Sequence, residues 1–253
     1  MRLKDKVAII TGASKGIGEG IAKRYSQEGA KVVLTSRSMD LLTPIADEIR
    51  DKGGNALALS VDVRKPESIQ EVVDKTVEEY GQLDIMVNNA GVSMAHPSEE
   101  LPPQDWSRAI ETDLSGVFYG CQAAAKQMMR QDGGCIINNT SMYGLVAVPM
   151  RAAYCASKAG ANMLTKVLAI EWADKNIRVN AIAPGYIRTE LVQGIIDKGI
   201  LDVAAIEKRT PQGRMGEVKD LMEIAVYLAS DDASFMTGSI ITIDGGWTAY
   251  GYL

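Results

Sequence analysis

Three side chains in the middle of the chain have types and spacings that suit proton transfer at an oxygen. Tyr154 and Lys158 are one helical turn apart, so a helix would place them on one face. An ammonium group beside a phenol favours the phenolate, which allows a tyrosine to exchange a proton near neutral pH. Ser141 adds a hydroxyl upstream of this pair. For the pair alone, the alternative is an amphipathic helix with an exposed lysine and a half-buried tyrosine.

Two predicted elements would position these side chains. The apolar run Cys135–Thr140 indicates a buried strand, which puts Ser141 at its C-terminal end. In open α/β sheets, ligands bind at that edge. The segment Arg151–Asp174 indicates the helix that carries Tyr154 and Lys158. Because this helix is apolar over much of its circumference, we expect it to be covered on more than one side, by the sheet and another helix or by a second subunit.

A glycine-rich turn follows the strand predicted for Lys6–Thr11 and precedes a helical pattern. Its glycines allow a tight turn, close approach of a pyrophosphate and close helix packing, and a helix N-terminus favours phosphate groups. A chance glycine turn without a ligand is the alternative. We expect a dinucleotide site whose contacts in this turn come from Gly12, Ser14, Lys15, Gly16, Ile17 and Gly18.

The strand predicted for Lys31–Ser36 bears on the choice of cofactor. Dinucleotide folds that use NAD usually place an acidic residue at the end of this strand, where it binds the ribose 2′-hydroxyl. This sequence has Ser36 there, followed by Arg37. A guanidinium can bind a 2′-phosphate bidentately, an acid would repel it, and Lys15 adds positive charge on the same side. We therefore predict NADP(H); the alternative is that both cations are solvated surface charges.

Strand and helix patterns alternate along the chain. Repeated βα units of this length predict an α/β, Rossmann-like fold: a doubly wound parallel sheet of about seven strands with helices on both faces. No long linker interrupts the pattern, so we expect a single domain over residues 1–253. Further helices are indicated at Met39–Lys52, Pro66–Tyr80, Trp106–Arg130 and Glu217–Ser230, and further strands at Ala56–Val61, Leu83–Asn88, Arg178–Ala183 and Ser239–Ile243.

Composition excludes several classes of function. The net charge of −5 argues against a nucleic-acid partner, since phosphate backbones require a basic surface. The sequence has neither an apolar run long enough to span a membrane nor a signal-peptide pattern, which favours a cytoplasmic protein without a membrane partner. The odd number of cysteines, Cys121, Cys135 and Cys155, fits a reducing compartment. Because His96 is the only histidine, we expect neither a histidine-based triad nor a metal site.

The Ser/Tyr/Lys set and the G-x-x-x-G-x-G turn resemble the short-chain dehydrogenase/reductase family, and the resemblance covers essentially the whole chain. It implies that Tyr154 is the general acid/base and that Ser141 hydrogen-bonds the substrate oxygen. It also implies that Lys158 binds the nicotinamide ribose and lowers the pKa of the tyrosine. Further cofactor contacts implied by the resemblance come from Asp62 and Val63 near the adenine, from Asn89, Ala90 and Gly91 in the family's NNAG element, and from Pro184, Gly185, Ile187 and Thr189 at the nicotinamide and phosphates.

One residue departs from the family. Asp113 lies where the family usually has asparagine, whose backbone carbonyl binds a water that links the catalytic lysine to solvent. An aspartate keeps that carbonyl but adds a negative charge if it is ionised. We include Asp113 in the predicted catalytic set. Because it lies in a buried helix, we expect its carboxyl to avoid ionisation or to find its own hydrogen-bond donors.

The region after these contacts suits substrate binding. Several glycines between about residues 188 and 215 predict a mobile lid, the alternative being a static pair of surface helices. The aromatic tail after Asp244 resembles that of polyol and sugar-acid members of the family, and such tails lie near the active site or a neighbouring subunit. A mostly apolar pocket with a few polar tips should be flanked by Met94, His96, Met142, Tyr143, Val148 and Tyr186.

We therefore predict an NADP(H)-dependent oxidoreductase that interconverts a small or medium ketone, of a sugar or polyol type, and its secondary alcohol. The resemblance also implies a homo-oligomer, a tetramer or a dimer. Three alternatives stay open: a 3-oxoacyl-thioester reductase with the same catalytic set, an isomerase or dehydratase on the same fold, and a non-catalytic protein that senses NADP.

Overall fold

Short strands of branched aliphatic residues form the centre of this computed structural model, which describes residues 1–251. Within these residues a seven-stranded sheet has the order β3-β2-β1-β4-β5-β6-β9, and every neighbouring pair is parallel. The strands are β1 (Val7–Thr11), β2 (Lys31–Ser36), β3 (Asn55–Ser60), β4 (Ile85–Asn88), β5 (Gly134–Asn139), β6 (Ile177–Pro184) and β9 (Ile240–Ile243).

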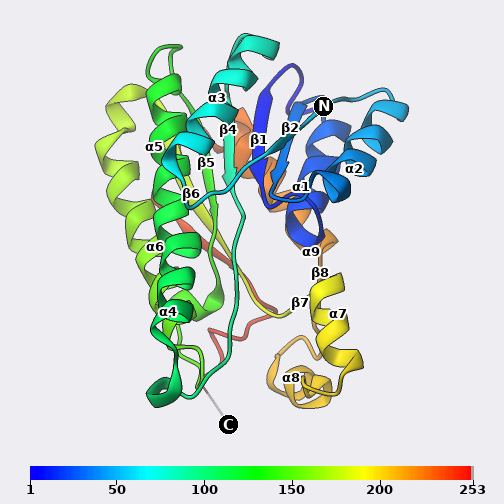
Figure 1. Cartoon of the computed structure of the whole chain (residues 1–253), viewed down its shortest axis with the longest axis vertical. Coiled ribbons are helices and arrows are strands. Elements are labelled where there is room, and N and C mark those ends of the chain that lie inside the picture. The colour runs from blue at the N-terminus through cyan, green and yellow to red at the C-terminus, as the bar shows by residue number, and fades with distance from the viewer. Residues whose placement is uncertain (252–253) are drawn as a thin grey trace.

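Helices cover both faces of this sheet (Figure 1). One face is packed by α1 (Gly16–Gln27), α2 (Met39–Asp51) and α9 (Lys219–Ala229), which form a buried core with alternate residues of the strands. The other face is packed by α3 (Pro66–Tyr80), α5 (Gly116–Met128) and α6 (Ala152–Glu171). The predicted doubly wound, Rossmann-like fold is therefore confirmed.

The chain reverses its direction of travel across the sheet beside β1. It moves outward from β1 through β2 to β3, then returns to the other side of β1 with β4. Side chains and loops at the carboxyl ends of β1 and β4 therefore border the crevice where open α/β sheets bind their ligands. Ser141 follows β5 at the same edge.

Smaller elements lie beyond that edge. Two helices, α7 (Glu190–Asp197) and α8 (Val203–Arg209), form most of the segment predicted as a lid, and Figure 1 shows them apart from the main sheet. A two-residue parallel pair of β7 (Ile187–Arg188) with β8 (Gly216–Glu217) joins the two ends of this segment. Short 3₁₀ turns lie at Ser98–Glu100, Met142–Gly144, Ala173–Lys175 and Asp231–Ala233.

The helix predicted for Trp106–Arg130 is not continuous. It is divided into α4 (Pro103–Ile110), a π-helical turn at Glu111–Ser115, and α5. A π turn adds a residue to the helical repeat and changes the direction of the side chains within it, and such turns are frequent at functional sites. Here the buried residue of the turn is Asp113, whose carboxyl hydrogen-bonds a neighbouring loop.

Other boundaries shift by a few residues. The helix predicted to begin at Glu217 begins at Lys219, because Gly216 and Glu217 pair with β7 and Asp220 accepts a hydrogen bond from the Glu217 N–H at 2.8 Å. The single domain predicted for residues 1–253 includes Tyr252 and Leu253, which lie outside the described residues. In the described part of the chain, none of the helices has the length and apolar character needed to cross a membrane.

Candidate active site

The glycine turn after β1 is packed so closely against the loop after β4 that a side chain would not fit at Gly12 or Gly18. Gly12 has a φ of +65°, and a Cβ placed on it would lie 2.8 Å from the Cα of Ala90. A Cβ on Gly18 would lie 2.5 Å from the Gly12 carbonyl oxygen and would also overlap the Asn89 amide. No side chain among the described residues caps the N-terminus of α1, so its first backbone N–H groups point outward from the turn. These features fit a bound phosphate.

Hydrogen bonds between β1 and the loop after β4 fix the shape of this turn. The Thr11 hydroxyl oxygen accepts from the backbone N–H groups of Asn89 (2.9 Å) and Ala90 (3.0 Å). The Asn89 amide donates to the carbonyl oxygens of Thr11 (2.9 Å) and Gly12 (3.1 Å), and its own oxygen accepts from the Asn139 side chain (2.8 Å). The predicted NNAG contacts Asn89, Ala90 and Gly91 therefore lie against the glycine turn.

The end of β2 presents the residues predicted to choose the cofactor. Ser36 Oγ accepts from the Ser38 N–H at 3.1 Å, which orders the turn that carries Arg37. Arg37 and Lys15 are exposed, and within residues 1–251 neither forms a salt bridge shorter than 4.0 Å. Their charges are therefore available to an anionic ligand.

The predicted adenine contact carries a salt bridge of its own. Asp62 accepts from two guanidinium nitrogens of Arg64, at 2.9 and 2.6 Å. These hydrogen bonds lower the pKa of Asp62 to about 2, so the carboxylate is ionised at neutral pH. Arg37 contributes to this lowering through its charge, which places it on the same side of the molecule. The neighbour Val63 is buried and packs beneath the cleft.

Ser141, Tyr154 and Lys158 meet at the carboxyl end of β5. Lys158 is buried, and its Nζ donates to the Asn139 carbonyl oxygen at 3.0 Å while lying 5.7 Å from the centre of the Tyr154 ring. Ser141 Oγ accepts from the Tyr143 N–H at 3.1 Å, so its hydroxyl proton is free to be donated to a substrate oxygen. Tyr154 and Lys158 thus lie side by side on α6, and Ser141 comes two residues after Asn139, whose carbonyl holds the lysine.

Asp113 lies behind this group. Its side chain is fully buried, Oδ1 accepts from the Val92 N–H at 2.7 Å, and Oδ2 has no hydrogen-bond partner among the described residues. A Cβ placed on Gly91 would lie 3.3 Å from Asp113 Oδ1 and 3.6 Å from Lys158 Nζ, so both groups face the same glycine. Burial raises the pKa of Asp113, although the nearby lysine charge opposes the shift. The hydrogen bond at Oδ1 anchors the Val92 loop.

The residues predicted at the nicotinamide follow β6. Pro184 ends the strand, Gly185 donates its N–H to the Ile243 carbonyl at 2.9 Å, and Ile187 begins β7. Thr189 caps α7 by accepting from the Val192 N–H at 3.3 Å, which leaves its hydroxyl proton available. Its methyl group would lie 3.3 Å from a Cβ on Gly16, so this stretch packs against the glycine turn.

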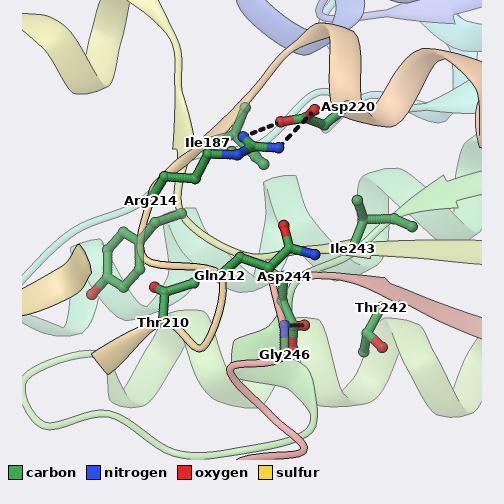
Figure 2. A pocket seen from close by; sticks show the side chains of 12 residues that line it. Ile187, Thr210, Gln212, Arg214, Asp220, Thr242, Ile243, Asp244 and Gly246 are labelled. Carbon is green, nitrogen blue, oxygen red and sulfur yellow. Dashed lines mark hydrogen bonds and ion pairs between the residues drawn. The ribbon is translucent and has the colours of Figure 1, made fainter. Parts of the chain in front are cut away.

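A pocket of about 390 Å³ adjoins this stretch (Figure 2). Arg214 and Asp220 point toward each other along one side, and the guanidinium donates to both carboxylate oxygens at 2.6 and 3.1 Å. Asp244 and the glycines after it lie on the opposite side. Tyr186 and Ile187 also line the pocket, but Ser141, Tyr154 and Lys158 do not.

Sequence reasoning did not single out Thr11 or Asn139. Thr11 holds the NNAG loop by its hydroxyl, and Asn139 holds both Lys158, by its carbonyl, and Asn89, by its amide. The signal in the sequence is the polar pair Asn138–Asn139 at the end of an otherwise apolar strand. Buried amides of this kind are retained where they are hydrogen-bonded, which makes such a pair a candidate for a positioning role.

Comparisons with known proteins agree with this geometry. The family model described as Enoyl-(Acyl carrier protein) reductase matches residues 12–248. The 3beta-hydroxysteroid dehydrogenase 1 of Eggerthella lenta is 41% identical, covering 98% of this chain and 95% of its own. The D-threitol dehydrogenase of Mycolicibacterium smegmatis is 39% identical, covering 98% and 94%. The crystal structure of a gluconate 5-dehydrogenase from Burkholderia cenocepacia, in complex with NADP and tartrate, is 35% identical with a TM-score of 0.93, covering 98% and 97%.

Proposed function

Since the chain belongs to the short-chain dehydrogenase/reductase family, we propose that it is an NADP(H)-dependent oxidoreductase that interconverts a ketone and its secondary alcohol. The observation that carries this proposal is the group formed by Ser141, Tyr154 and Lys158, with the lysine anchored on the Asn139 carbonyl beside the glycine turn.

The chain's residues fit a dinucleotide with a 2′-phosphate. The uncapped N-terminus of α1 suits the pyrophosphate, and Arg37 and Lys15 offer charge to the 2′-phosphate. Thr189 would bind the nicotinamide end together with the backbone of Ile187. When bound, the cofactor supplies or accepts a hydride. The NADP complex of the gluconate 5-dehydrogenase supports the choice of NADP.

In the reductive direction, Tyr154 would donate its phenolic proton to the substrate oxygen, and Ser141 would hydrogen-bond the same oxygen. Lys158 stabilises the phenolate that forms, because its ammonium charge lies close to the tyrosine ring. Its hydrogen bond to Asn139 keeps the ammonium group in place through the reaction. The carbonyl of Asp113 would hold the water that returns the proton from solvent.

The named substrates of the relatives are alcohols of different sizes, a hydroxysteroid, threitol and gluconate. All carry a secondary alcohol, which supports that group as the reacting centre here. We place this chain with the enzymes of small or medium polyol-type substrates, since the neighbouring hydroxyl groups of Tyr143 and Tyr186 offer polar contacts to such a substrate.

We also propose a homo-oligomer in the cytoplasm. Met163, Val167 and Ile170 lie one turn apart on α6 and are 59%, 42% and 81% exposed. Contiguous apolar surface of this kind marks an interaction site, and a second copy of α6 would cover it. The three cysteines are free thiols, which suits a reducing compartment.

A reductase of acyl thioesters is the second candidate, because the description of the matching family model names an acyl carrier protein. The two candidates separate in a screen of NADPH oxidation and NADP⁺ reduction over ketones, sugars, polyols and 3-oxoacyl thioesters. Turnover confined to thioesters would replace the first candidate with the second.

Cofactor choice tests the proposal at the residues that carry it. We expect kcat/KM to be at least tenfold higher with NADPH than with NADH, on the basis of one or two charge-assisted hydrogen bonds. The double variant Ser36→Asp, Arg37→Ala should reverse this preference, because the carboxylate would bind the 2′-hydroxyl and repel the phosphate. Equal kcat/KM for both cofactors in the wild type would show that Arg37 and Lys15 are only surface charges.

A further inference from the structure

Three aromatic rings stand in series beside the catalytic serine. Tyr143, two positions after Ser141, meets Tyr186 edge to face with ring centres 6.0 Å apart, and Tyr186 meets Trp247 with centres 5.3 Å apart. We call Tyr143, Tyr186 and Trp247 the aromatic wall. They come from the loop after β5, the loop after β6 and the C-terminal tail, so three distant parts of the chain build one surface.

The hydroxyl groups of the wall form a directed pair. The Tyr143 hydroxyl donates to the Tyr186 oxygen at 2.7 Å. Burial, reinforced by the Tyr186 hydroxyl, raises the pKa of Tyr143, so it stays a donor over the whole working range of pH. The Tyr186 proton is therefore directed away from Tyr143, and no acceptor for it is found among residues 1–251. Tyr186 is a hydrogen-bond donor prepared for a group that enters the cleft.

Arg209 fixes the wall from the lid. This residue ends α8, and its guanidinium lies 4.9 Å from the ring centres of both Trp247 and Tyr250. It also donates to the backbone carbonyls of Trp247 (3.5 Å) and Tyr250 (2.8 Å). The tail is bound at its start as well, because Asp244 accepts from the Gly246 N–H and from the Thr248 N–H and hydroxyl. Trp247 thus lies between the turn at Asp244 and the Arg209 guanidinium, and its ring packs against that of Tyr186.

His96, the other polar side chain predicted to flank the pocket, already has a partner. The His96 ring pairs with Asp105 at 3.3 Å, and Arg151 donates to the Ser93 hydroxyl. The Ser141 hydroxyl and Tyr154 are needed at the reacting oxygen. The Tyr186 hydroxyl is therefore a group that can bind a second oxygen of the substrate.

Building on the proposed function, we propose that Tyr186, oriented by Tyr143, determines specificity by donating a hydrogen bond to a hydroxyl oxygen next to the reacting carbon. The substrates would then be vicinal hydroxyketones and the corresponding diols, whose C–H faces lie against the rings of Tyr186 and Trp247. A ketone without that hydroxyl would leave the donor unpaired, and a site built for a hydroxyl discriminates against a substrate that lacks it.

The test compares trans-cyclohexane-1,2-diol with cyclohexanol, which differ by one hydroxyl. NADP⁺ reduction is followed for the wild type, Tyr186→Phe, Tyr143→Phe and Tyr80→Phe, the last being a control on α3, remote from the site. We expect the wild type to favour the diol in kcat/KM. The ratio of diol to cyclohexanol should fall about tenfold in Tyr186→Phe, which loses one hydrogen bond. It should fall less in Tyr143→Phe, which loses only the orientation, and stay at the wild-type value in Tyr80→Phe.

A binding measurement separates this proposal from the enzymatic one. Calorimetric titration of each alcohol into the protein saturated with NADP⁺ gives the same ratio without requiring turnover. Suppose that the protein binds the diol more tightly than cyclohexanol, loses that preference in Tyr186→Phe, and yet turns over neither alcohol. That result would overturn the oxidoreductase proposal but support the role of Tyr186 in specificity. If the wild type shows no preference for the diol, or if Tyr186→Phe keeps that preference, the proposal that Tyr186 determines specificity is wrong.

Discussion

Different kinds of contact form the side of the cleft proposed to bind the cofactor and the side proposed to bind the substrate. Around the glycine turn, backbone atoms and buried amides approach each other closely, as in the contacts of Gly12, Thr11 and Asn89. Around the substrate, side chains from separate segments meet, as in the wall of Tyr186 and Trp247 that Arg209 holds. The first side admits almost no change of residue, whereas the second can change its lining without moving the sheet.

This difference explains how one fold serves several substrates. The relatives share the sheet and carry names that refer to a steroid, threitol and gluconate. The structure of the gluconate 5-dehydrogenase is a complex with NADP. Functions grafted on a common fold usually differ in their loops, and in this chain the aromatic wall lies in two loops and the C-terminal tail.

The largest expected effect on turnover is at Tyr154, between the cofactor side and the substrate side. Tyr154→Phe removes the proton donor and little else, so turnover should fall by about 10²–10⁴-fold. NADPH binding, measured by fluorescence titration, should stay within a few-fold of the wild type. Lys158→Met is the matched comparison and should weaken both turnover and cofactor binding. A phenylalanine variant with more than a few per cent of the wild-type rate would remove Tyr154 from the acid/base role.

Two glycine-to-alanine changes compare the sides directly. Gly18→Ala places a methyl group against the Gly12 carbonyl and the Asn89 amide. It should lower the free energy of unfolding by about 1–3 kcal/mol and weaken NADPH binding. Gly194→Ala, on α7, meets nothing within 4 Å and should raise the stability by up to about 1 kcal/mol.

Urea denaturation and NADPH titration of both glycine variants provide the measurement. The glycine turn would not be the more tightly packed of the two regions if Gly18→Ala bound NADPH as the wild type does. The same would follow if Gly194→Ala proved the more destabilised of the two, since the lid would then be packed more tightly than the turn.

The smallest expected effect on catalysis is at Asp113. If the carboxyl is neutral and only its backbone carbonyl serves the proton relay, Asp113→Asn keeps the group's shape and its acceptor for the Val92 N–H. We expect kcat within a few-fold of the wild type and a nearly unshifted pH–rate profile. A shift of a full pH unit or more would show that an ionised Asp113 acts on Lys158 and Tyr154.

The same substitution should change how stability depends on pH. Because burial raises the pKa of Asp113, the native state holds a proton that the unfolded chain releases above about pH 4. The stability from this proton is present below that pH and is lost as pH rises through the native pKa. Asp113→Asn should therefore gain stability relative to the wild type between pH 4.5 and 7.5, as measured by urea denaturation. If the difference in the free energy of unfolding between the two proteins did not change with pH, the pKa of Asp113 would not be raised.

The contrast between the two sides also separates what the sequence predicts from what it does not. The turn at Gly12 was predicted from the spacing of its glycines between a strand and a helix, and the roles of Ser141, Tyr154 and Lys158 from the family resemblance that their spacing carries. The sheet followed from the regular alternation of strands and helices. Each of these features depends on residues that are close together in the chain.

The features that sequence reasoning missed depend on distant partners. The π turn at Asp113 interrupts a segment whose sequence pattern predicts one continuous helix. The Asp113 carboxyl accepts a hydrogen bond from Val92, which lies in a different loop. The wall joins Tyr143 to Trp247 through contacts that no spacing reveals. A tail predicted only to lie near the active site is fixed there by Arg209, and this required the structure.

Transfer of deuterium from cofactor to product tests the reaction most directly. The protein is mixed with 2-hydroxycyclohexanone and NADPH deuterated at the transferable position of the nicotinamide, and the product is analysed by mass spectrometry. We expect one deuterium at the new carbinol carbon for each NADPH consumed, and no such product with Tyr154→Phe. Substrate that changes without consuming NADPH, or diol that forms without deuterium, would contradict hydride transfer and would favour an isomerase or dehydratase on this fold.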